Sequence, residues 1–360
     1  MLRIALTLDK IEVIAPNLKR RLSGVTATIV RLLPVQARSI WIVATGPGLP
    51  AHVPSIPLWS VIRMSRRTHR VWHARRNTEM LMGLVLRHVL RKRLKLVFTS
   101  ASQRHHTRYT RLLISGMDAV VATSRKSASY LRRPARVIIH GIDTGTFHPP
   151  LDRRAHRRSL GLSENVTIGC YGRIRRQKGT DVFVDAMLEV LPRHTGVTAL
   201  VIGRAAHKHV PFLQGLREKV TRAGLQDRIL FLPEVPVEEM PRWYQALDLL
   251  VAPQRWEGFG LTPLEAMACG VPVIATTVGA FDELVVEGET GRLIPPGDVE
   301  QMRAAVDATL ALPATLQQWS TAARRHVEAG FRIEDEAATL NALYRELLDG
   351  GGGNGTELTG

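Results

Sequence analysis

The sequence is poor in residues that form covalent or metal cross-links. Two of its 360 residues are cysteine, Cys170 and Cys269, and both lie among apolar neighbours. Such a pair predicts neither a disulfide framework nor a zinc site, because no group of His and Cys residues has the spacing of metal ligands. The Asp-x-Asp motif is also absent. We therefore expect a reducing compartment and no bound metal ion.

Long apolar runs and aromatic residues are scarce as well. No run reaches the roughly 18 apolar residues of a membrane-spanning helix, and Asp9 and Glu12 interrupt the start of the chain where a signal peptide would be apolar. Aromatic residues make up 5% of the chain, which disfavours nucleic-acid binding by base stacking. Phosphate-loop and nicotinamide-binding fingerprints are missing too. We expect a cytoplasmic protein without a nucleic-acid partner.

Positive charge is concentrated in the first part of the chain. The formal net charge is +17, with 45% hydrophobic and 22% charged residues, as in globular proteins. Residues 1–150 contain 26 Lys and Arg against 5 Asp and Glu, whereas residues 151–360 contain 23 against 27. So basic a first part predicts a polyanionic partner. Nucleic acid and an anionic membrane surface both have the required charge, and the scarcity of aromatic residues favours the membrane surface. A surface that merely favours arginine is the simpler alternative.

Strand and helix patterns alternate through both parts of the chain. This alternation predicts an α/β protein with two Rossmann-like lobes, each a parallel sheet with helices on both faces, and a cleft between the lobes. Paired prolines and a charge run lie at 147–158, so we expect domains at 1–150 and 151–349. Residues 350–360 are rich in glycine and are expected to be disordered.

The most informative local pattern lies at residues 253–279. An apolar strand at 249–252 runs into a glycine-bracketed loop, and a helix with Pro263 in its first turn follows. Backbone N–H groups in such a place suit a phosphate. The expected donors are the amides of Phe259, Gly260, Leu261 and Thr262. Glu257 and Glu265 flank the loop as hydroxyl-binding carboxylates, which together with a phosphate describes a nucleotide-sugar site. An ordinary strand-to-helix turn is the alternative.

A second loop, at residues 172–179, also follows a strand and opens a helix. After Gly172, the cations Arg173 and Lys178 could converge on a diphosphate and neutralise the charge that grows on it as a sugar bond breaks. A basic surface turn is the alternative. Arg204, at the end of the next strand, is expected to border the base of the nucleotide.

The first lobe offers further candidates at the ends of its strands. Gly24 stands at a loop-to-helix entry where the backbone could approach the donor phosphates. His73 follows a short strand, and it is either a substrate contact or a packed core residue. Arg104, His105 and His106 follow the next strand and are candidate contacts to the acceptor or the sugar. We expect a helix over 104–114, on which the two histidines would face different directions, and this argues against a metal pair.

The complete strings resemble those of a known family. Glu257 and Glu265 match the Glu-x7-Glu signature of retaining glycosyltransferases of family four. The block VPVIAT…LIPPGD at 271–298 matches that family's next motif, and residues 172–179 match its Gly-Arg-x4-Lys-Gly block. First-lobe strings such as VWHARRNTEM at 71–80 resemble one branch of the family, the lipopolysaccharide core mannosyltransferases. The resemblance covers most of residues 10–300.

The resemblance implies roles for individual residues. Glu257 would bind hydroxyls of the donor sugar, and Glu265 would hold the nucleotide ribose. Arg173 and Lys178 would bind the diphosphate without a metal ion, and the final helix would return to the first lobe. A covalent nucleophile is the alternative role for Glu257.

The resemblance also implies an activity. Mannose would pass from GDP-mannose, with retention of configuration, to the inner-core 3-deoxy-octulosonate (Kdo) of a lipid A precursor at the cytoplasmic surface of the inner membrane. This acceptor is an anionic glycolipid, which agrees with the basic first lobe. The alternatives are a glucosyl- or galactosyltransferase acting on a membrane-surface glycolipid, a hydrolytic or phosphorolytic enzyme of the same fold, and a nucleic-acid-binding protein.

Overall fold

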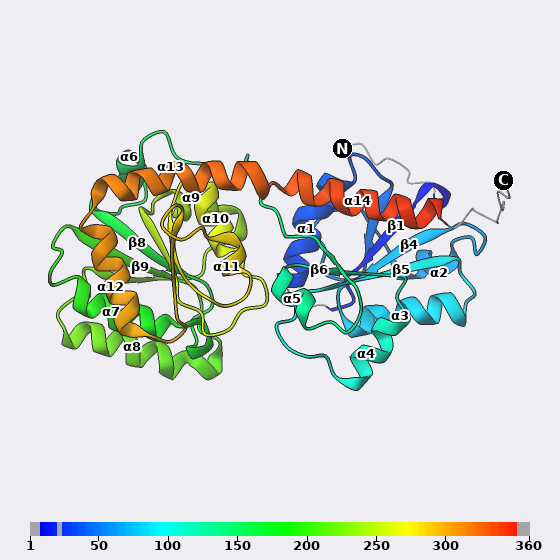
Figure 1. The fold of residues 1–360 in the computed structure, drawn as a ribbon, viewed down its shortest axis with the longest axis horizontal. Coiled ribbons are helices and arrows are strands. Elements are labelled where there is room, and N and C mark those ends of the chain that lie inside the picture. Colours follow the sequence, from blue (N-terminus) through cyan, green and yellow to red (C-terminus); the bar gives the residue numbers. More distant parts are fainter. Residues whose placement is uncertain (1–7, 20–23, 351–360) are drawn as a thin grey trace, which may run out of the picture. The chain divides into compact units, whose positions relative to one another are not determined.

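The chain folds into two compact units. The structure, a computed structural model, describes residues 8–19 and 24–350 (Figure 1). The first unit comprises Met1–His140 and Ile333–Gly360, and the second comprises Gly141–Arg332. The first boundary therefore lies earlier in the chain than the expected residue 150. The last helix belongs to the first unit, as the family resemblance implied, rather than to a domain at 151–349. The expected disorder of the tail falls on residues 351–360, which lie outside the described residues.

The first unit contains a seven-stranded parallel sheet. Its strands, in spatial order, are β3 (Ser55–Ile56), β2 (Ile42–Thr45), β1 (Val13–Pro16), β4 (Arg70–Ala74), β5 (Leu94–Ser100), β6 (Ala119–Ala122) and β7 (Arg136–Val137). Its helices are η1 (Leu8–Lys10), α1 (Gly24–Gln36), α2 (Leu58–Arg63), α3 (Asn77–His88), α4 (Arg108–Ser115), α5 (Arg125–Ser129) and α14 (Ile333–Asp349).

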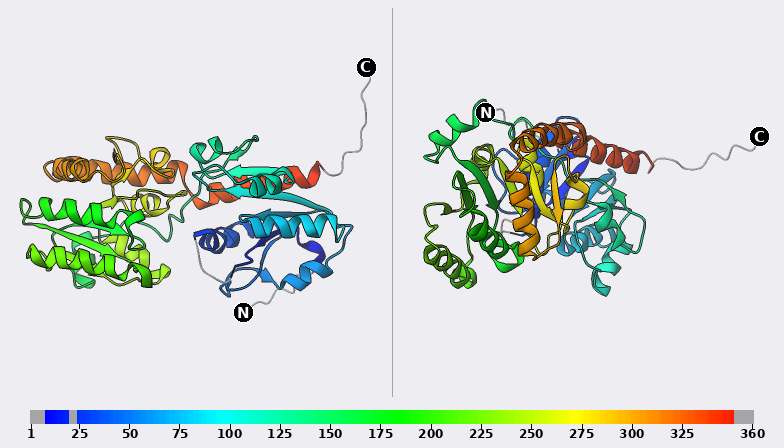
Figure 2. Two further views of the ribbon diagram at one scale, coloured as in Figure 1. Left: turned by 90° about the horizontal axis from the view of Figure 1, so that it is seen from below. Right: turned by 60° about the vertical axis from the view of Figure 1, so that its left-hand side comes forward.

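Alternate residues of these strands pack into two separate apolar cores, one on each face of the sheet. Val13 of β1 faces a core that includes residues of α1 and α14, whereas its neighbour Ile14 faces a core that includes residues of α2, α3 and α4. This follows from the two-residue period of a strand with both faces covered. Figures 1 and 2 show α14 (red) lying along this sheet, where it contacts α1 and β4. Burial of its apolar face explains why the last helix returns to the first unit.

The second unit contains a six-stranded parallel sheet. Its strands, in spatial order, are β10 (Ile229–Leu232), β9 (Val197–Ile202), β8 (Val166–Tyr171), β11 (Leu249–Ala252), β12 (Val273–Thr276) and β13 (Gly291–Ile294). Its longer helices are α7 (Thr180–Val190), α8 (Val210–Arg222), α12 (Val299–Leu310) and α13 (Pro313–Gly330). The shorter ones are α6 (Arg153–Ser159), η2 (Arg176–Lys178), η3 (His207–His209), η4 (Val237–Glu239), α9 (Met240–Gln245), α10 (Thr262–Ala268) and α11 (Phe281–Leu284).

One expected helix begins later than predicted. The pattern at 104–114 suggested a continuous basic helix, but α4 begins at Arg108. Thr107 caps it, since its side chain accepts a hydrogen bond from the Thr110 amide. The two adjacent histidines before it therefore lie in a loop, and the expectation that a helix turns them to different faces is wrong.

No helix among residues 8–19 and 24–350 is long and apolar enough to cross a membrane.

Candidate functional site

The strand order of the second sheet identifies where a ligand binds. Strands β10, β9 and β8 run to one side and β11, β12 and β13 to the other, so the order reverses between β8 and β11. In open parallel sheets, ligands bind at such a switch point, beyond the carboxyl ends of the strands. The two loops that leave these strands are residues 172–179 and 253–261, the same two segments that the sequence singled out.

The two loops are fixed to one another. Arg255 in the second loop forms a bidentate ion pair with Asp181 at the start of α7, with N–O distances of 2.6 and 3.0 Å. The Arg255 amide also donates to the carbonyl of Gln177 at 3.0 Å. Gly179 has a φ of +70°, and an added Cβ would lie 1.8 Å from the carbonyl oxygen of Pro253. Only glycine allows the two backbones to approach so closely.

The predicted diphosphate cation and sugar-binding carboxylate are in direct contact. The Lys178 ammonium pairs with Glu257 Oε2, and both side chains are largely buried, with 17% and 19% of their surface exposed. The other oxygen, Oε1, accepts a hydrogen bond of 3.0 Å from the Gly258 amide, which fixes the carboxylate. A group that binds phosphate therefore lies beside one that can bind hydroxyls. This is the arrangement that a sugar linked directly to a diphosphate requires.

The glycine-bracketed loop that follows is held from behind by the β12–α11 turn. The Phe259 carbonyl accepts a hydrogen bond of 3.0 Å from the Ala280 amide, and the Phe259 ring is buried. Gly260 has a φ of +89°, and a Cβ there would lie 2.2 Å from the ring of Phe281. Leu261 and Thr262 then begin α10, and the buried Thr262 hydroxyl has no hydrogen-bond partner among the described residues. Phosphate binding by these four backbone amides stays a prediction.

The second carboxylate is positioned by a buried tyrosine. Glu265 Oε2 accepts a hydrogen bond of 2.7 Å from the hydroxyl of Tyr244 on α9. Burial, together with the charge of Glu265, raises the pKa of Tyr244 well above its usual value, so the hydroxyl keeps its proton and donates it. Glu265 is thereby held at the first turn of α10, on the same edge of the sheet as Glu257.

The loops at 172–179 and 253–261, with Lys178 and Glu257 in contact, form what we call the cradle. The remaining predicted residues of this unit lie around it. Gly172 is exposed with a φ of +135°. The exposed side chain of Arg173 has no hydrogen bond or ion pair within residues 8–19 and 24–350. Arg204 forms an exposed ion pair of 3.2 Å with Glu234, which lies in the loop after β10. The structure brings Lys178 and Glu257 together, whereas Arg173 and Arg204 extend into solvent.

Three residues that organise the site were not predicted. Asp181 and Arg255 connect the two loops, and Tyr244 positions Glu265. The sequence carried no signal for these pairs, because their members lie 74 and 21 residues apart and their side chains are common on any surface. Only the strand order makes them neighbours.

In the first unit, His73 is a packed residue. Its side chain is fully buried at the end of β4, and its two ring nitrogens lie 2.6 Å from the Tyr344 hydroxyl of α14 and 2.6 Å from the Thr99 hydroxyl of β5. Burial, and secondarily the charge of Arg75, hold the pKa of His73 well below its usual 6.5. Both nitrogens are thus occupied by protein groups, which favours the core alternative over substrate contact.

This buried histidine predicts a loss of stability at acidic pH. Below pH 6.5 the unfolded chain protonates His73 while the folded protein does not, so the unfolded state binds more protons. The contribution of neutral His73 to the free energy of unfolding is complete above that pH. It declines by up to about 1.4 kcal/mol per pH unit as the pH falls toward the lower pKa of the folded state. Urea unfolding between about pH 7.5 and 5.5 should show this slope, and His73→Asn should reduce it. Equal slopes in both proteins would contradict the prediction.

The other first-unit candidates lie in the loop between β5 and α4. Arg104 and His105 are exposed, and His106 is half-buried. His106 Nε2 lies 3.2 Å from the Ser100 hydroxyl, and the ring of His105 packs edge-on against Tyr130 with centroids 5.3 Å apart. Their roles toward substrate stay predictions.

Gly24 is the exposed first residue of α1. An added Cβ there would meet no atom within 4 Å among the described residues, so space does not require glycine. Residues 20–23, which precede it in the chain, lie outside the described residues. Among the described residues, no three His, Cys, Asp or Glu side chains are grouped to hold a metal ion. The expected independence of metal stays a prediction.

Comparison with known proteins defines the class. Two parallel-sheet Rossmann-like domains, one with its cation–carboxylate cradle at the switch point, form the GT-B architecture of glycosyltransferases. The crystal structure of Anabaena Alr3699/HepE in complex with UDP superposes with a TM-score of 0.80 over 94% of this chain and 100% of that one. At 20% identity, this likeness shows the fold alone.

Closer relatives define the family. Residues 152–326 match the family of group 1 glycosyl transferases. The lipopolysaccharide core biosynthesis mannosyltransferase LpcC of Rhizobium leguminosarum bv. viciae is 50% identical over 94% of this chain and 97% of its own length. The lipopolysaccharide core biosynthesis mannosyltransferase LpsB of Rhizobium meliloti (strain 1021) is 51% identical over 94% of this chain and 98% of its own length. The chain therefore belongs to the group 1 glycosyltransferase family.

Proposed function

We propose that this protein transfers mannose from GDP-mannose to the inner-core Kdo of a lipid A precursor during lipopolysaccharide core synthesis. The observation that carries the proposal is the half-identity, over nearly the whole of both chains, to the core mannosyltransferases LpcC and LpsB. The basic first part of the chain supports an anionic glycolipid acceptor at the cytoplasmic surface of the inner membrane.

The second unit would bind the donor at its switch point. Lys178 would turn from Glu257 toward the diphosphate, with Arg173 approaching from the solvent side. Glu257 would then accept hydrogen bonds from sugar hydroxyls. Glu265, held by Tyr244, would accept them from the ribose. Cations beside the diphosphate stabilise the charge that develops on it as the sugar leaves.

The transfer would retain the configuration at the anomeric carbon. The bond from this carbon to the phosphate oxygen breaks, and its electron pair stays on the nucleoside diphosphate. The acceptor hydroxyl forms the new bond on the same face and gives its proton to the departing phosphate. Glu257 pairs with Lys178, and this supports a role in ligand binding rather than as a nucleophile.

The donor and acceptor are tested by incubation with a panel of nucleotide-sugars and a Kdo–lipid A acceptor, scored by mass. We expect a single mannosyl addition, and only with GDP-mannose. A glucosyl or galactosyl addition would replace the donor assignment. Release of free mannose at the same rate with and without acceptor would indicate a hydrolase.

Transfer should also proceed without a divalent cation. We expect the rate to change by less than about twofold when EDTA is added, because Arg173, Lys178 and backbone amides supply the positive charge that a metal ion provides elsewhere. The measurement is the initial rate with EDTA, with Mg²⁺ and with Mn²⁺. Activity that disappears with chelator and returns with either cation would refute this part of the proposal.

A further inference from the structure

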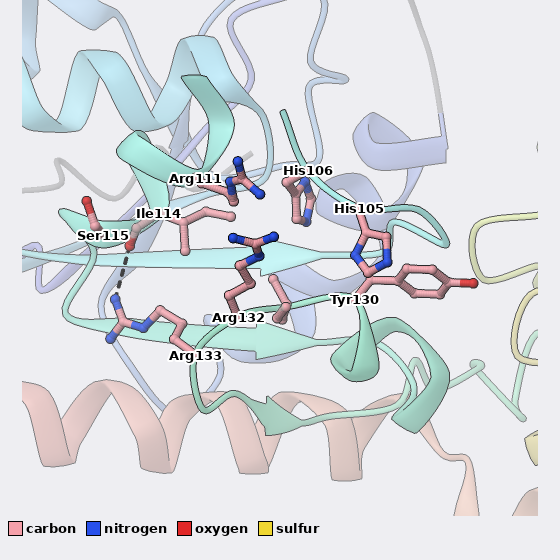
Figure 3. Close-up of a pocket in the computed structure, with 9 residues that line it drawn as sticks. His105, His106, Arg111, Ile114, Ser115, Tyr130, Arg132 and Arg133 are labelled. Atoms are coloured by element: carbon pink, nitrogen blue, oxygen red, sulfur yellow. Dashed lines mark hydrogen bonds between the residues drawn. The ribbon is translucent and has the colours of Figure 1, made fainter. Parts of the chain in front are cut away.

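The first unit contains a pocket that the proposed chemistry has not used. It has a volume of about 210 Å³ and lies between α4 and the segment that follows α5 (Figure 3). His105 and His106 line it near the carboxyl ends of the strands, and Ser115 lines it at the end of α4. The pocket therefore extends from the edge of the sheet where ligands bind in parallel α/β units along the side of one helix.

Two arginines of this pocket converge without a counter-charge. Figure 3 shows the guanidinium groups of Arg111 and Arg132 facing one another across the pocket, with the ring of His106 beside Arg111. Neither guanidinium has a hydrogen bond or ion pair within the described residues, and no Asp or Glu is among the residues that line the pocket. Two guanidinium groups that face one pocket with no acid beside them offer positive charge and N–H donors with which an anion can pair.

A third arginine shows the contrast. Arg133 also lines the pocket, but its guanidinium donates to the carbonyl of Ile114 at 3.0 Å (Figure 3) and to the carbonyl of Met117 at 2.9 Å. Its donors connect the segment after α5 to the end of α4, and it has a structural role. Arg111 and Arg132 have no such role.

Apolar side chains also line the pocket and are exposed on the helix beside it. Ile114 and Leu131 line the pocket together with the ring of Tyr130. On the outer face of α4, Tyr109 and Leu112 are exposed, Leu112 to 70%. Apolar walls around paired cations fit an anionic group carried by a larger amphiphilic molecule better than they fit a free ion.

We propose that Arg111 and Arg132 bind a phosphate or carboxylate group of the acceptor glycolipid, at a distance from its reacting hydroxyl. This inference rests on the proposed function, because it takes the acceptor to be anionic. The acceptor would present its hydroxyl at the carboxyl edge, near His105, and its anionic group inside the pocket. The two arginines would thus determine specificity for the acceptor and would leave the donor site unaffected.

The test compares an Arg111→Gln/Arg132→Gln double variant with the native protein. Each arginine lost should raise the KM for the Kdo–lipid A acceptor on the order of tenfold, since hydrogen bonds to charged groups have that strength. The KM for the donor should stay unchanged. An Arg111→Lys/Arg132→Lys variant keeps the charge and should recover most of the affinity. The matched control is Arg38→Gln/Arg93→Gln, which removes two exposed arginines of the same unit outside the pocket.

Two further arms separate the possible outcomes. Inorganic phosphate should compete with the acceptor in the native protein and not in the Gln double variant. If phosphate competes but the double variant has an unchanged KM for the acceptor, the pocket binds free phosphate only. That result would overturn the assignment. An acceptor KM that rises equally in the control would show general charge attraction and overturn it too. Sedimentation with phosphatidylcholine vesicles containing the acceptor measures binding without transfer. A failure of the proposed reaction is therefore distinguishable from a failure of this pocket.

Discussion

Lys178→Ala should reduce kcat for sugar transfer by about 10²- to 10³-fold, the cost of removing one preorganised group that stabilises developing charge. The ammonium lies at the switch point of the second sheet and is held beside the carboxylate of Glu257. Its charge matters most when the diphosphate departs, so the effect should fall on kcat more than on the KM for the donor. Initial rates over a range of donor concentrations give both constants.

The matched control is Lys208→Ala, which removes an exposed lysine of η3 in the same unit. It should keep nearly full activity. Lys178→Arg should retain more activity than Lys178→Ala, because the charge remains while the geometry changes. Circular dichroism should show that all three variants are folded. If Lys178→Ala retained kcat within about threefold, the charge would not act on the leaving group, and the donor site would have to lie elsewhere.

Gly179→Ala should strongly reduce the stability of the second unit. The left-handed φ of +70° costs an alanine about 1–2 kcal/mol. The Cβ would also lie 1.8 Å from the Pro253 carbonyl oxygen, and forcing the two loops apart adds about 1–3 kcal/mol. We therefore expect the free energy of unfolding to fall by about 2–5 kcal/mol in urea denaturation. Activity should fall as well, because the same movement separates Lys178 from Glu257.

Gly196→Ala is the control for this substitution. Gly196 precedes β9 in the same unit, its φ is not in the left-handed range, and nothing lies within 4 Å of an added Cβ. This variant should be within about 0.5 kcal/mol of the native protein. Equal stability of the two alanine variants would show that the loops can separate freely, and the rigid cradle described above would be wrong.

The local elements could be predicted because their signals are local. The strand at 249–252 was expected at the bounds that the structure shows, since it is a short apolar run followed by turn residues. The helix predicted over 104–114 was wrong at its start. The side chain of Thr107 accepts a hydrogen bond from the Thr110 amide and so caps the helix. The residue pattern alone does not distinguish a capping threonine from a threonine inside a helix.

The candidate site was predictable in part for the same reason. The glycine-bracketed loop and the Gly-Arg-x4-Lys-Gly segment are each contiguous, so the residue types within each loop are enough to indicate a phosphate ligand. Their pairing was not readable. Lys178 and Glu257 are 79 residues apart, and their contact depends on β8 and β11 being neighbours in the sheet.

The sequence by itself thus determined the alternating α/β architecture, the two loops and the uneven charge, since these follow from residue types within short windows. Only the tertiary structure decided that His73 is enclosed by Tyr344 and Thr99, and that Arg111 and Arg132 face one pocket. Such contacts join distant segments. They form because strand order and the burial of apolar faces bring those segments together, and residues with the same local character elsewhere in the chain meet different neighbours.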